Sequence, residues 1–245
     1  MLESIGVDIR EIDAIFITHE HTDHISGAGI LSRRFNIPIY ANGETWIAME
    51  DKIKNIDPIN RREFYKESSF YFRDIFITPV PIFHDAANPN GFVLRSENEK
   101  ISVVTDTGYI NTQMLDMMRD SNLYFLESNH DIEMLKTGRY TWPLKQRILS
   151  TKGHLSNDNT SEVLQEIIKK EGEIYILSHL SIDNNTPEIA YNQARKTLEN
   201  KGGELDIGSV KLEVAPRFET SKLYDLKEEK WKYYFQMMTV LCRKA

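Results

Sequence analysis

The segment FITHEHTDHISG, residues 16–27, places three of the chain's seven histidines and one aspartate within six consecutive positions. The apolar run AIFIT, residues 14–18, overlaps its start and has the β-branched and aromatic character of a strand. His19 therefore begins the loop at the carboxyl end of a strand, where functional groups gather in layered α/β folds. This feature predicts an α/β fold with a chemical site at that end of a sheet.

The spacing of the cluster indicates metal binding. His19 and His21 stand two positions apart, so an extended backbone directs both rings to the same side. Asp23 and His24 follow where we expect the chain to enter a helix near Ile25, and they diverge from the first pair. Four ligands in two pairs suit two metal ions better than one. The alternative, a polar turn with coincidental histidines, offers no packing reason for this density.

Further ligand candidates follow other predicted strands. His84 comes after TPVPIF, Asp106 after ISVVT and His179 after IYILS. Imidazole and carboxylate groups are ligands of Zn²⁺, Mn²⁺ and Fe²⁺, and an aspartate can bridge two ions about 3.5–4 Å apart. Taken alone, His84 or His179 is more often a structural histidine, and only the first cluster makes each a ligand candidate; the alternative for Asp106 in TDTG is a turn residue. For His130 and His154, the sequence leaves two alternatives: a chemical role, or a structural role as a capping or loop residue.

Short β-rich runs alternate with helical patterns along the chain. We expect strands at 14–18, 37–41, 75–83, 91–96, 101–105, 123–128, 174–178 and 210–215, and helices at 25–35, 44–55, 111–120, 143–150, 158–171 and 187–201. This alternation predicts layered α/β structure with helices outside the sheets. A chain of 245 residues with 40% hydrophobic residues can bury a full core without disulfides or structural metals.

Composition excludes several classes of protein. The single cysteine, Cys242, excludes an internal disulfide framework and a cysteine-based zinc site. No apolar run approaches the ~18 residues of a membrane span, and the first residues, MLESIGVDIREID, lack the apolar core of a signal peptide. We therefore expect a soluble cytoplasmic protein. The net charge of −7 disfavours a broad nucleic-acid-binding surface, but it is compatible with a local basic groove.

The order H-x-H-x-D-H, His, Asp, His resembles the ligand order of the metallo-β-lactamase superfamily, and THEHTDH resembles its signature motif. Longer segments are similar to the YycJ (WalJ)-like branch, which is related to RNase Z and RNase J and is associated with 5′→3′ exonuclease action on DNA. These segments are GILSRRFNIPIYA (29–41), TDTGY (105–109), LESNHD (126–131), LKQRILSTKGHLSN (144–157) and LSHLSIDNNTPEIA (177–190). The resemblance runs from about Leu2 to about Leu226.

The resemblance implies a four-layer αββα sandwich over residues 1–226, shortened at its N-terminus because the family's opening strands are absent. After this domain, the spacing of apolar residues predicts an amphipathic tail helix at 227–245. The resemblance also implies two divalent ions, Zn²⁺ or Mn²⁺ with Fe²⁺ as a further candidate. Their seven ligands would be His19, His21, Asp23, His24, His84, Asp106 and His179. Asp106 would bridge the ions, and Glu127 and His154 would assist proton transfer as catalytic residues.

The function expected from these observations is that of a two-metal phosphodiesterase, a 5′→3′ exonuclease with DNA favoured over RNA. The same metals could instead open a lactone or cleave an ester, and a third hypothesis is an inactive domain that only binds nucleic acid or a partner. An unpaired sheet edge would invite self-association, so a homodimer stays open. Candidate contacts to the nucleic-acid backbone, each with the alternative of a solvated surface charge, are Arg33, Arg34, Arg61, Arg62, Lys145, Arg147 and Lys152.

Overall fold

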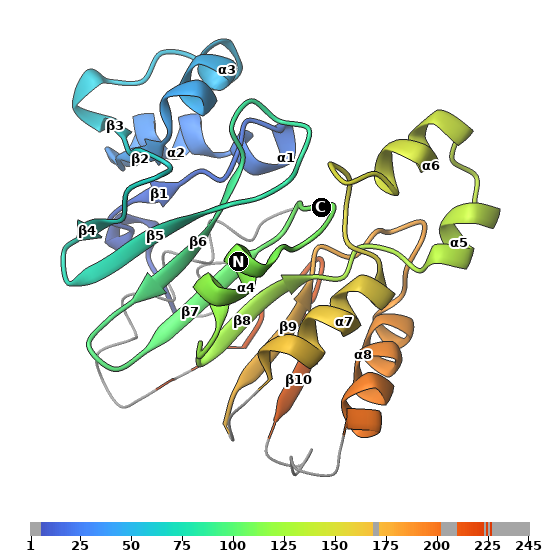
Figure 1. The fold of residues 1–245 in the computed structure, drawn as a ribbon. Coiled ribbons are helices and arrows are strands. Elements are labelled where there is room, and N and C mark those ends of the chain that lie inside the picture. Colours follow the sequence, from blue (N-terminus) through green and yellow to red (C-terminus); the bar gives the residue numbers. More distant parts are fainter. Residues whose placement is uncertain (1–5, 169–171, 202–209, 223, 225, 227–245) are drawn as a thin grey trace. The chain divides into compact units, whose positions relative to one another are not determined.

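The computed structural model describes residues 6–168, 172–201, 210–222, 224 and 226, and the structural statements below concern these residues. They form two compact units (Figure 1). Unit 1 contains the described residues up to Ser68, the segment Ala86–Pro89 and the described residues from Pro216 onward. Unit 2 contains Ser69–Asp85 and the described residues from Asn90 to Ala215. The predicted tail helix at 227–245 lies outside the described residues.

Unit 1 is built on a small parallel sheet with the strand order β1-β2-β3. Its elements are η2 (Ile9–Glu11), β1 (Ile15–Phe16), α1 (Thr22–Ile25), α2 (Ala28–Phe35), β2 (Ile39–Ala41), α3 (Gly43–Ile53), η3 (Pro58–Asn60) and β3 (Arg61–Glu63). Trp46 and Met49 of α3 are buried in one core with Ile15 and Ile39 of the sheet. Gly29 permits close packing of α2 on α3, because a Cβ there would lie 2.3 Å from the carbonyl oxygen of Ile53.

Unit 2 is built on a seven-stranded mixed sheet with the strand order β10-β9-β8-β7-β6-β5-β4. Its strands are β4 (Phe70–Phe72), β5 (Ile75–Pro81), β6 (Asn90–Arg95), β7 (Lys100–Val104), β8 (Leu123–Glu127), β9 (Ile174–Ser178) and β10 (Lys211–Val214). Its helices are α4 (Thr112–Met118), α5 (Ile132–Thr137), α6 (Trp142–Ile148), α7 (Asn157–Ile167) and α8 (Pro187–Lys201).

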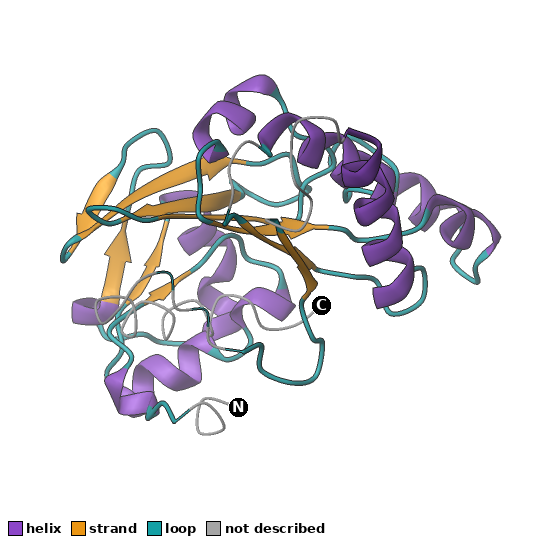
Figure 2. Ribbon diagram, turned by 90° about the horizontal axis from the view of Figure 1, so that it is seen from below, coloured by secondary structure: helices purple, strands orange, loops and turns teal. Residues whose placement is uncertain are grey.

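The core of unit 2 lies between the sheet and three helices. Met114 of α4, Leu164 of α7 and Ala194 of α8 belong to one buried cluster with strand residues that include Val104 and Leu177. Figure 2 distinguishes these helices from the strands on which they pack. Strands β7 and β8 are buried at every position, as expected for central strands in the parallel part of a sheet.

The strand directions in unit 2 place several loops at one edge of the sheet. Strands β7, β8 and β9 are parallel, and Val104 pairs with Leu126, which pairs with Leu177. Strand β5 is antiparallel to β6, and β6 is antiparallel to β7, so β5 runs in the same direction as β7. The carboxyl ends of all four strands therefore lie at the same edge, which brings the loops after β5, β7, β8 and β9 together.

The structure confirms the α/β class and contains a strand or helix within each range predicted from the sequence. The sequence patterns missed β3, β4 and α5, which are short. Helix α1 also begins at Thr22 rather than near Ile25, with His21 at the N-cap position and without a side-chain capping bond. Within the described residues, no helix is long and apolar enough to cross a membrane.

Candidate metal-binding residues

The loop after β1 carries the histidine cluster of unit 1. The hydroxyl oxygen of Thr18 lies 3.0 Å from Nδ1 of His19 and 3.1 Å from Nδ1 of His24. Both hydrogen bonds use Nδ1 of the histidine ring, so the same Thr18 hydroxyl helps to orient His19 and His24. A metal-bound histidine is usually held in this way by its second nitrogen. The arrangement therefore leaves Nε2 of His19 and Nε2 of His24 as the candidate ligand atoms.

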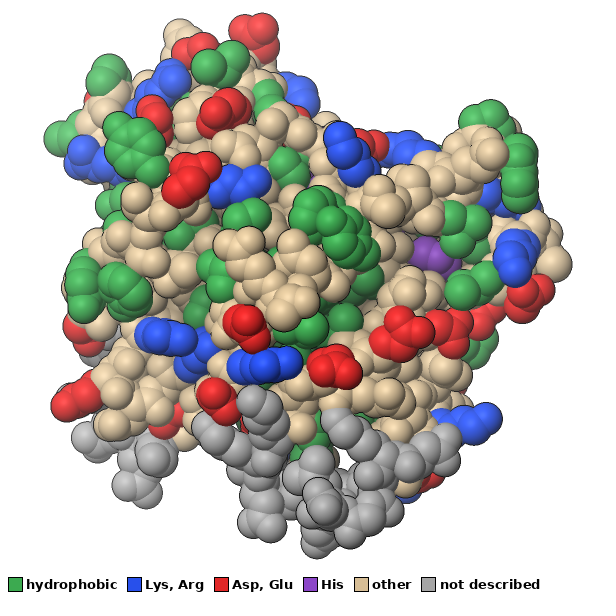
Figure 3. All heavy atoms as spheres, viewed as in Figure 1, with side chains coloured by type: hydrophobic (Ala, Val, Ile, Leu, Met, Phe, Trp, Pro, Cys, Tyr) green, Lys and Arg blue, Asp and Glu red, His purple; other side chains and the backbone are tan. Residues whose placement is uncertain are grey.

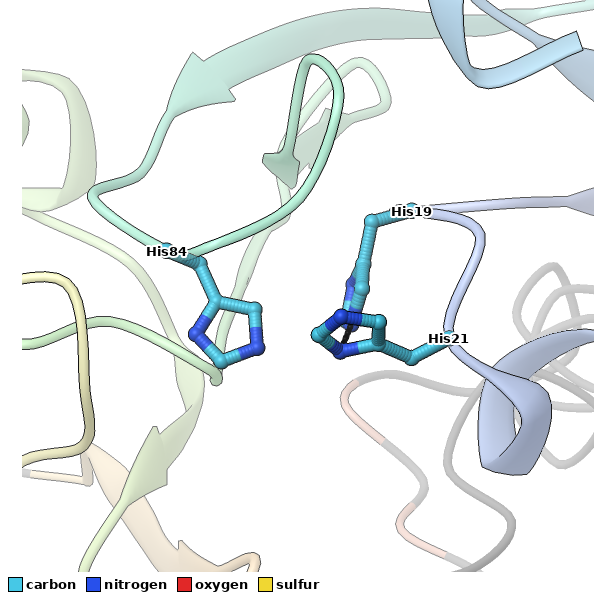
Figure 4. A group of neighbouring side chains, drawn as sticks. All are labelled: His19, His21 and His84. Carbon is cyan, nitrogen blue, oxygen red and sulfur yellow. Dashed lines mark hydrogen bonds between the residues drawn. The ribbon is translucent and has the colours of Figure 1, made fainter. Parts of the chain in front are cut away.

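The spacing of His19 and His21 suits a shared ion. Nε2 of His19 lies 3.1 Å from Nδ1 of His21, and Figure 4 shows the two rings side by side with this hydrogen bond dashed. Two nitrogen ligands about 2.0–2.1 Å from a tetrahedral ion lie roughly 3.3 Å apart. Asp23 and His24 form a second pair, with Oδ2 of Asp23 located 3.8 Å from Nε2 of His24. The two pairs do not diverge as expected, because the ring centroids of His19 and His24 lie only 4.0 Å apart.

Glu20, between the first two histidines, anchors the loop. Its side chain is buried, and Oε1 accepts a hydrogen bond of 2.9 Å from the backbone of Ala87. Its carbonyl oxygen accepts a bond of 3.1 Å from Nζ of Lys52 in α3. Both contacts are within unit 1. These contacts fix the backbone between His19 and His21. Glu20 therefore has a structural role and is not a ligand candidate.

In unit 2, the Asp106 carboxylate lies between two imidazoles. Its Oδ1 is 3.3 Å from Nε2 of His179 and 3.9 Å from Nε2 of His84. Asp106 follows β7, His179 follows β9, and His84, also drawn in Figure 4, extends from the loop after β5. An aspartate flanked by two histidine nitrogens has the arrangement of a carboxylate that bridges two ions.

The opposite nitrogen of each flanking imidazole is hydrogen-bonded. Nδ1 of His84 lies 3.2 Å from the carbonyl oxygen of Gly153, so this nitrogen donates and Nε2 carries the lone pair. Nδ1 of His179 lies 2.7 Å from Oε1 of Glu127, which fixes the same tautomer. In the neutral form of each ring the lone pair is therefore on Nε2, the nitrogen that faces Asp106, as a metal ligand requires.

Glu127 connects the loops of this site. It is fully buried; Oε1 contacts Nδ1 of His179 and Nδ1 of His154 at 2.8 Å. Oε2 accepts hydrogen bonds from the backbone of Thr107 at 2.9 Å and of Leu155 at 3.3 Å. Burial alone would raise the pKa of Glu127, but the two imidazoles, His154 foremost, outweigh burial and lower that pKa to about 2. The group is therefore a carboxylate that holds three segments in register.

His154 lies beside the ligand candidates of unit 2. One donor atom from each of Asp106, Glu127, His154 and His179 fits within 4.8 Å of the others. Burial opposes a positive charge on His154, but the Glu127 carboxylate outweighs burial and raises the His154 pKa above its ordinary value. Nδ1 of His154 faces Glu127, so Nε2 is the nitrogen left for a ligand or a proton.

Two of the ligand candidates have unusual backbone conformations. Asp106 has φ +57° and His179 has φ +58°, the left-handed region that residues other than glycine rarely occupy. Asn129 holds the second of these, since its amide donates a 2.9 Å bond to the carbonyl oxygen of His179. Such conformations persist where the surroundings determine them, and they concentrate at functional sites. Both residues turn sharply at the end of a strand, which aims their side chains across the sheet edge.

Comparison with known proteins identifies the family. Residues 3–180 match the family model described as a β-lactamase superfamily domain. The sequence is 40% identical over 202 residues to exodeoxyribonuclease YycJ of Bacillus anthracis, covering 82% of this chain and 76% of that protein. It is 36% identical over 210 residues to exodeoxyribonuclease WalJ of Streptococcus pneumoniae, covering 85% and 77%. The chain belongs to the metallo-β-lactamase superfamily, in the branch of YycJ and WalJ.

A solved structure agrees with this assignment at the level of fold. The metallo-β-lactamase fold protein YhfI from Bacillus subtilis superposes with a TM-score of 0.62 over 84% of this chain and 77% of that one, at 17% identity. The resemblance to the metallo-β-lactamase family seen in the THEHTDH motif is thereby confirmed. The individual ligands stay a prediction, and so do the catalytic roles of Glu127 and His154. The geometry within each unit supports both.

The basic residues expected to contact a nucleic acid differ in their surroundings. Lys145 is buried, and its Nζ donates to the carbonyl oxygens of Lys136 and Gly138 at 2.7 Å, so it caps α5 and was wrongly included. Arg147 donates from Nε to the Asp85 carboxylate next to His84. Figure 3 shows acidic and basic side chains interspersed over the visible face rather than one large basic surface.

Sequence reasoning missed the residues that orient the ligands. Thr18 directly precedes His19, and Asn129 lies two positions after Glu127, so both stand inside the motifs already singled out. His130, whose role stayed open, is buried, and neither of its ring nitrogens has a hydrogen-bond partner among the described residues. Burial lowers the pKa of His130 to about 4. The ring is therefore neutral at physiological pH.

Proposed function

We propose that the chain is a metal-dependent phosphodiesterase that degrades DNA from its 5′ end. The observation that carries the proposal is the Asp106 carboxylate in unit 2, whose Oδ1 lies 3.9 Å from Nε2 of His84 and 3.3 Å from Nε2 of His179. The relatives at 36–40% identity are named exodeoxyribonucleases, which supports DNA as the substrate. A hydrolase for lactones or esters would use the same donor set, but no observation in this chain favours it.

The proposed ligands are the seven residues of the two clusters. His19, His21 and His84 would hold one ion; Asp23, His24 and His179 would hold the other; and Asp106 would bridge them. The donor atoms fit a metal because His24, His84 and His179 each use Nδ1 for a hydrogen bond within the protein. Nε2 of each ring is therefore left for an ion. Nitrogen and oxygen donors without cysteine suit Zn²⁺ and Mn²⁺. Bound divalent ions supply a hydrolytic nucleophile near neutral pH and neutralise charge on the phosphate oxygens.

The residues around this donor set orient the substrate and move protons. His154 would hydrogen-bond a phosphate oxygen through Nε2 and donate a proton to the leaving oxygen. Its raised pKa favours the protonated ring that this step requires. Glu127 acts through His154 and His179 and is therefore a positioning residue, since its carboxylate is buried and bonded on both oxygens.

The test uses the purified full chain with Mn²⁺ or Zn²⁺ and four substrates. These are 5′-phosphorylated single-stranded DNA, RNA of the same sequence, DNA blocked at its 5′ end, and a simple lactone. We expect mononucleotides to accumulate from the first, with slower turnover of the RNA and of the blocked DNA. The Asp106→Ala variant, purified identically, controls for contaminating nucleases. Hydrolysis of the lactone with no release of nucleotides would overturn the proposal in favour of the esterase alternative.

A further inference from the structure

Tyr109 presents an aromatic ring on the loop that carries Asp106. The residue is 39% exposed, although its ring stacks on Phe83 with the centroids 4.1 Å apart and the planes 22° from parallel. Phe83 directly precedes His84, so the pair joins the loops of two proposed ligands. Tyr109 is three residues from Asp106, and this limits the separation of their Cα atoms to about 10 Å.

Hydrogen bonds hold this aromatic pair in place. The Thr107 hydroxyl accepts a 3.2 Å bond from the backbone N–H of Phe83 and donates a 2.8 Å bond to the carbonyl oxygen of Tyr109. The backbone N–H of Gly108 donates to the carbonyl oxygen of Phe83 at 2.9 Å. The orientation of Tyr109 is therefore set before any ligand arrives, which reduces the ordering cost of binding.

The loop that carries Tyr109 packs on a segment that contains two basic residues. Gly108 packs so closely on the loop before His154 that an added Cβ would lie 2.3 Å from the carbonyl carbon of Thr151. Lys152, the next residue, is exposed, and the half-exposed Arg147, which forms an ion pair with Asp85, precedes the same loop. An exposed aromatic ring on a loop that packs beside an exposed lysine is a combination that suits single-stranded nucleic acid, with the ring stacking a base and the lysine meeting a phosphate.

We propose that Tyr109 stacks a nucleobase at the single-stranded 5′ end of the substrate and so positions the neighbouring phosphodiester for cleavage. This inference rests on the proposed function. A base stacked on the outer face of Tyr109 would extend the Phe83–Tyr109 stack by one ring. Because every base has a π face, the contact would favour unpaired ends without selecting a sequence.

The test compares Tyr109→Leu and Tyr109→Phe on 5′-phosphorylated single-stranded DNA. Leucine covers Phe83 but offers no π face, whereas phenylalanine keeps the face. We expect Tyr109→Leu to lose roughly 5- to 140-fold in kcat/KM, the range of one base–aromatic stack, and Tyr109→Phe to stay close to wild type. Metal content and melting temperature should match wild type in both variants.

Tyr71→Leu is a matched control. Tyr71 is also exposed and also packs against a phenylalanine, Phe76, with ring centroids 4.9 Å apart. Phe76 lies near the start of β5 and His84 lies beyond its end, so about 20 Å of extended strand separates Tyr71 from the site. Tyr71→Leu should retain full activity on DNA.

A set of substrates with one abasic position each tests the contact from the side of the DNA. For wild type, removal of one particular base near the 5′ end should lower kcat/KM as much as Tyr109→Leu does. The variant should then lose nothing further on that substrate. Equal activity of wild type and Tyr109→Leu, or indifference of wild type to every abasic position, would overturn this inference alone. Failure of wild type to degrade DNA would overturn the proposed function, and the stacking proposal with it.

Discussion

The two donor clusters are assembled in different ways. In unit 1, all four donors lie between His19 and His24 on one loop, and the hydroxyl of Thr18 orients two of the rings. In unit 2, the donors come from the ends of separate strands, and the buried carboxylate of Glu127 holds their loops together. The first cluster is local in sequence, whereas the second exists only once the seven-stranded sheet has formed.

This difference predicts unequal sensitivity to mutation. A neutral hydroxyl contributes less to orientation than a buried carboxylate bonded to two imidazoles, because charge-assisted hydrogen bonds are about twice as strong as neutral ones. We therefore expect a substitution in the hydrogen-bond network of unit 2 to displace several ligands at once. A substitution of Thr18 should affect only the histidines of the loop after β1.

The largest expected effect is that of Asp106→Ala. Without this carboxylate, two cations would face each other with less negative charge between them. We expect loss of at least one ion and a fall in turnover of roughly three orders of magnitude or more, since metal catalysis is worth several kcal/mol. Elemental analysis and the DNA assay measure the two effects. Wild-type metal content and rate in this variant would remove Asp106 from the site.

His154→Ala should lose turnover without losing metal. The ring is placed to donate a proton, and general-acid groups contribute typically ~10²–10⁴-fold to rate. A nitrophenyl phosphodiester, whose leaving group needs no proton, should partly rescue the variant. Metal loss in His154→Ala would instead make it a ligand, and an unchanged rate on DNA would make it a loop residue only.

Glu127→Gln and Thr18→Val compare the two orienting groups directly. Gln keeps the shape of Glu127 but turns an NH₂ group toward the donors of Thr107, Leu155 or the imidazoles. Loss of such an outer contact typically costs about 10–100-fold in metal affinity or activity. We expect Glu127→Gln near the upper end of this range and Thr18→Val near the lower end. The reverse order in metal titrations would show that the Thr18 hydroxyl orients its ligands more strongly than the Glu127 carboxylate does.

His130 should make unit 2 sensitive to acid. Its pKa is about 4 in the folded chain against an ordinary 6.5, so as pH falls below 6.5 the unfolded chain takes up a proton that the folded chain does not. The free energy of unfolding should therefore drop by about 3 kcal/mol between pH 7 and pH 4. Urea unfolding of wild type and His130→Phe across this range measures the difference. Parallel pH curves for the two proteins would contradict it.

The sequence predicted the local features and missed the tertiary ones. The loop cluster at His19 and the strand before Asp106 were readable because each depends on neighbouring residues. The wrong expectation for Lys145 arose because its burial depends on the carbonyl oxygens of α5, a helix that the patterns did not indicate. Strands β3 and β4 have three residues each, too few for a periodic signal. The role of Glu127 as a shared partner depends on the pairing of three strands.

The most direct test of the central claim is the number of divalent ions bound by the purified full chain. The measurement combines elemental analysis with quantitative amino-acid analysis, for wild type and for one ligand variant of each cluster, His21→Ala and His179→Ala. The account predicts two ions per wild-type chain and fewer than two in each variant. A folded, active wild-type chain with no stoichiometric metal, or variants that both retain two ions, would contradict it.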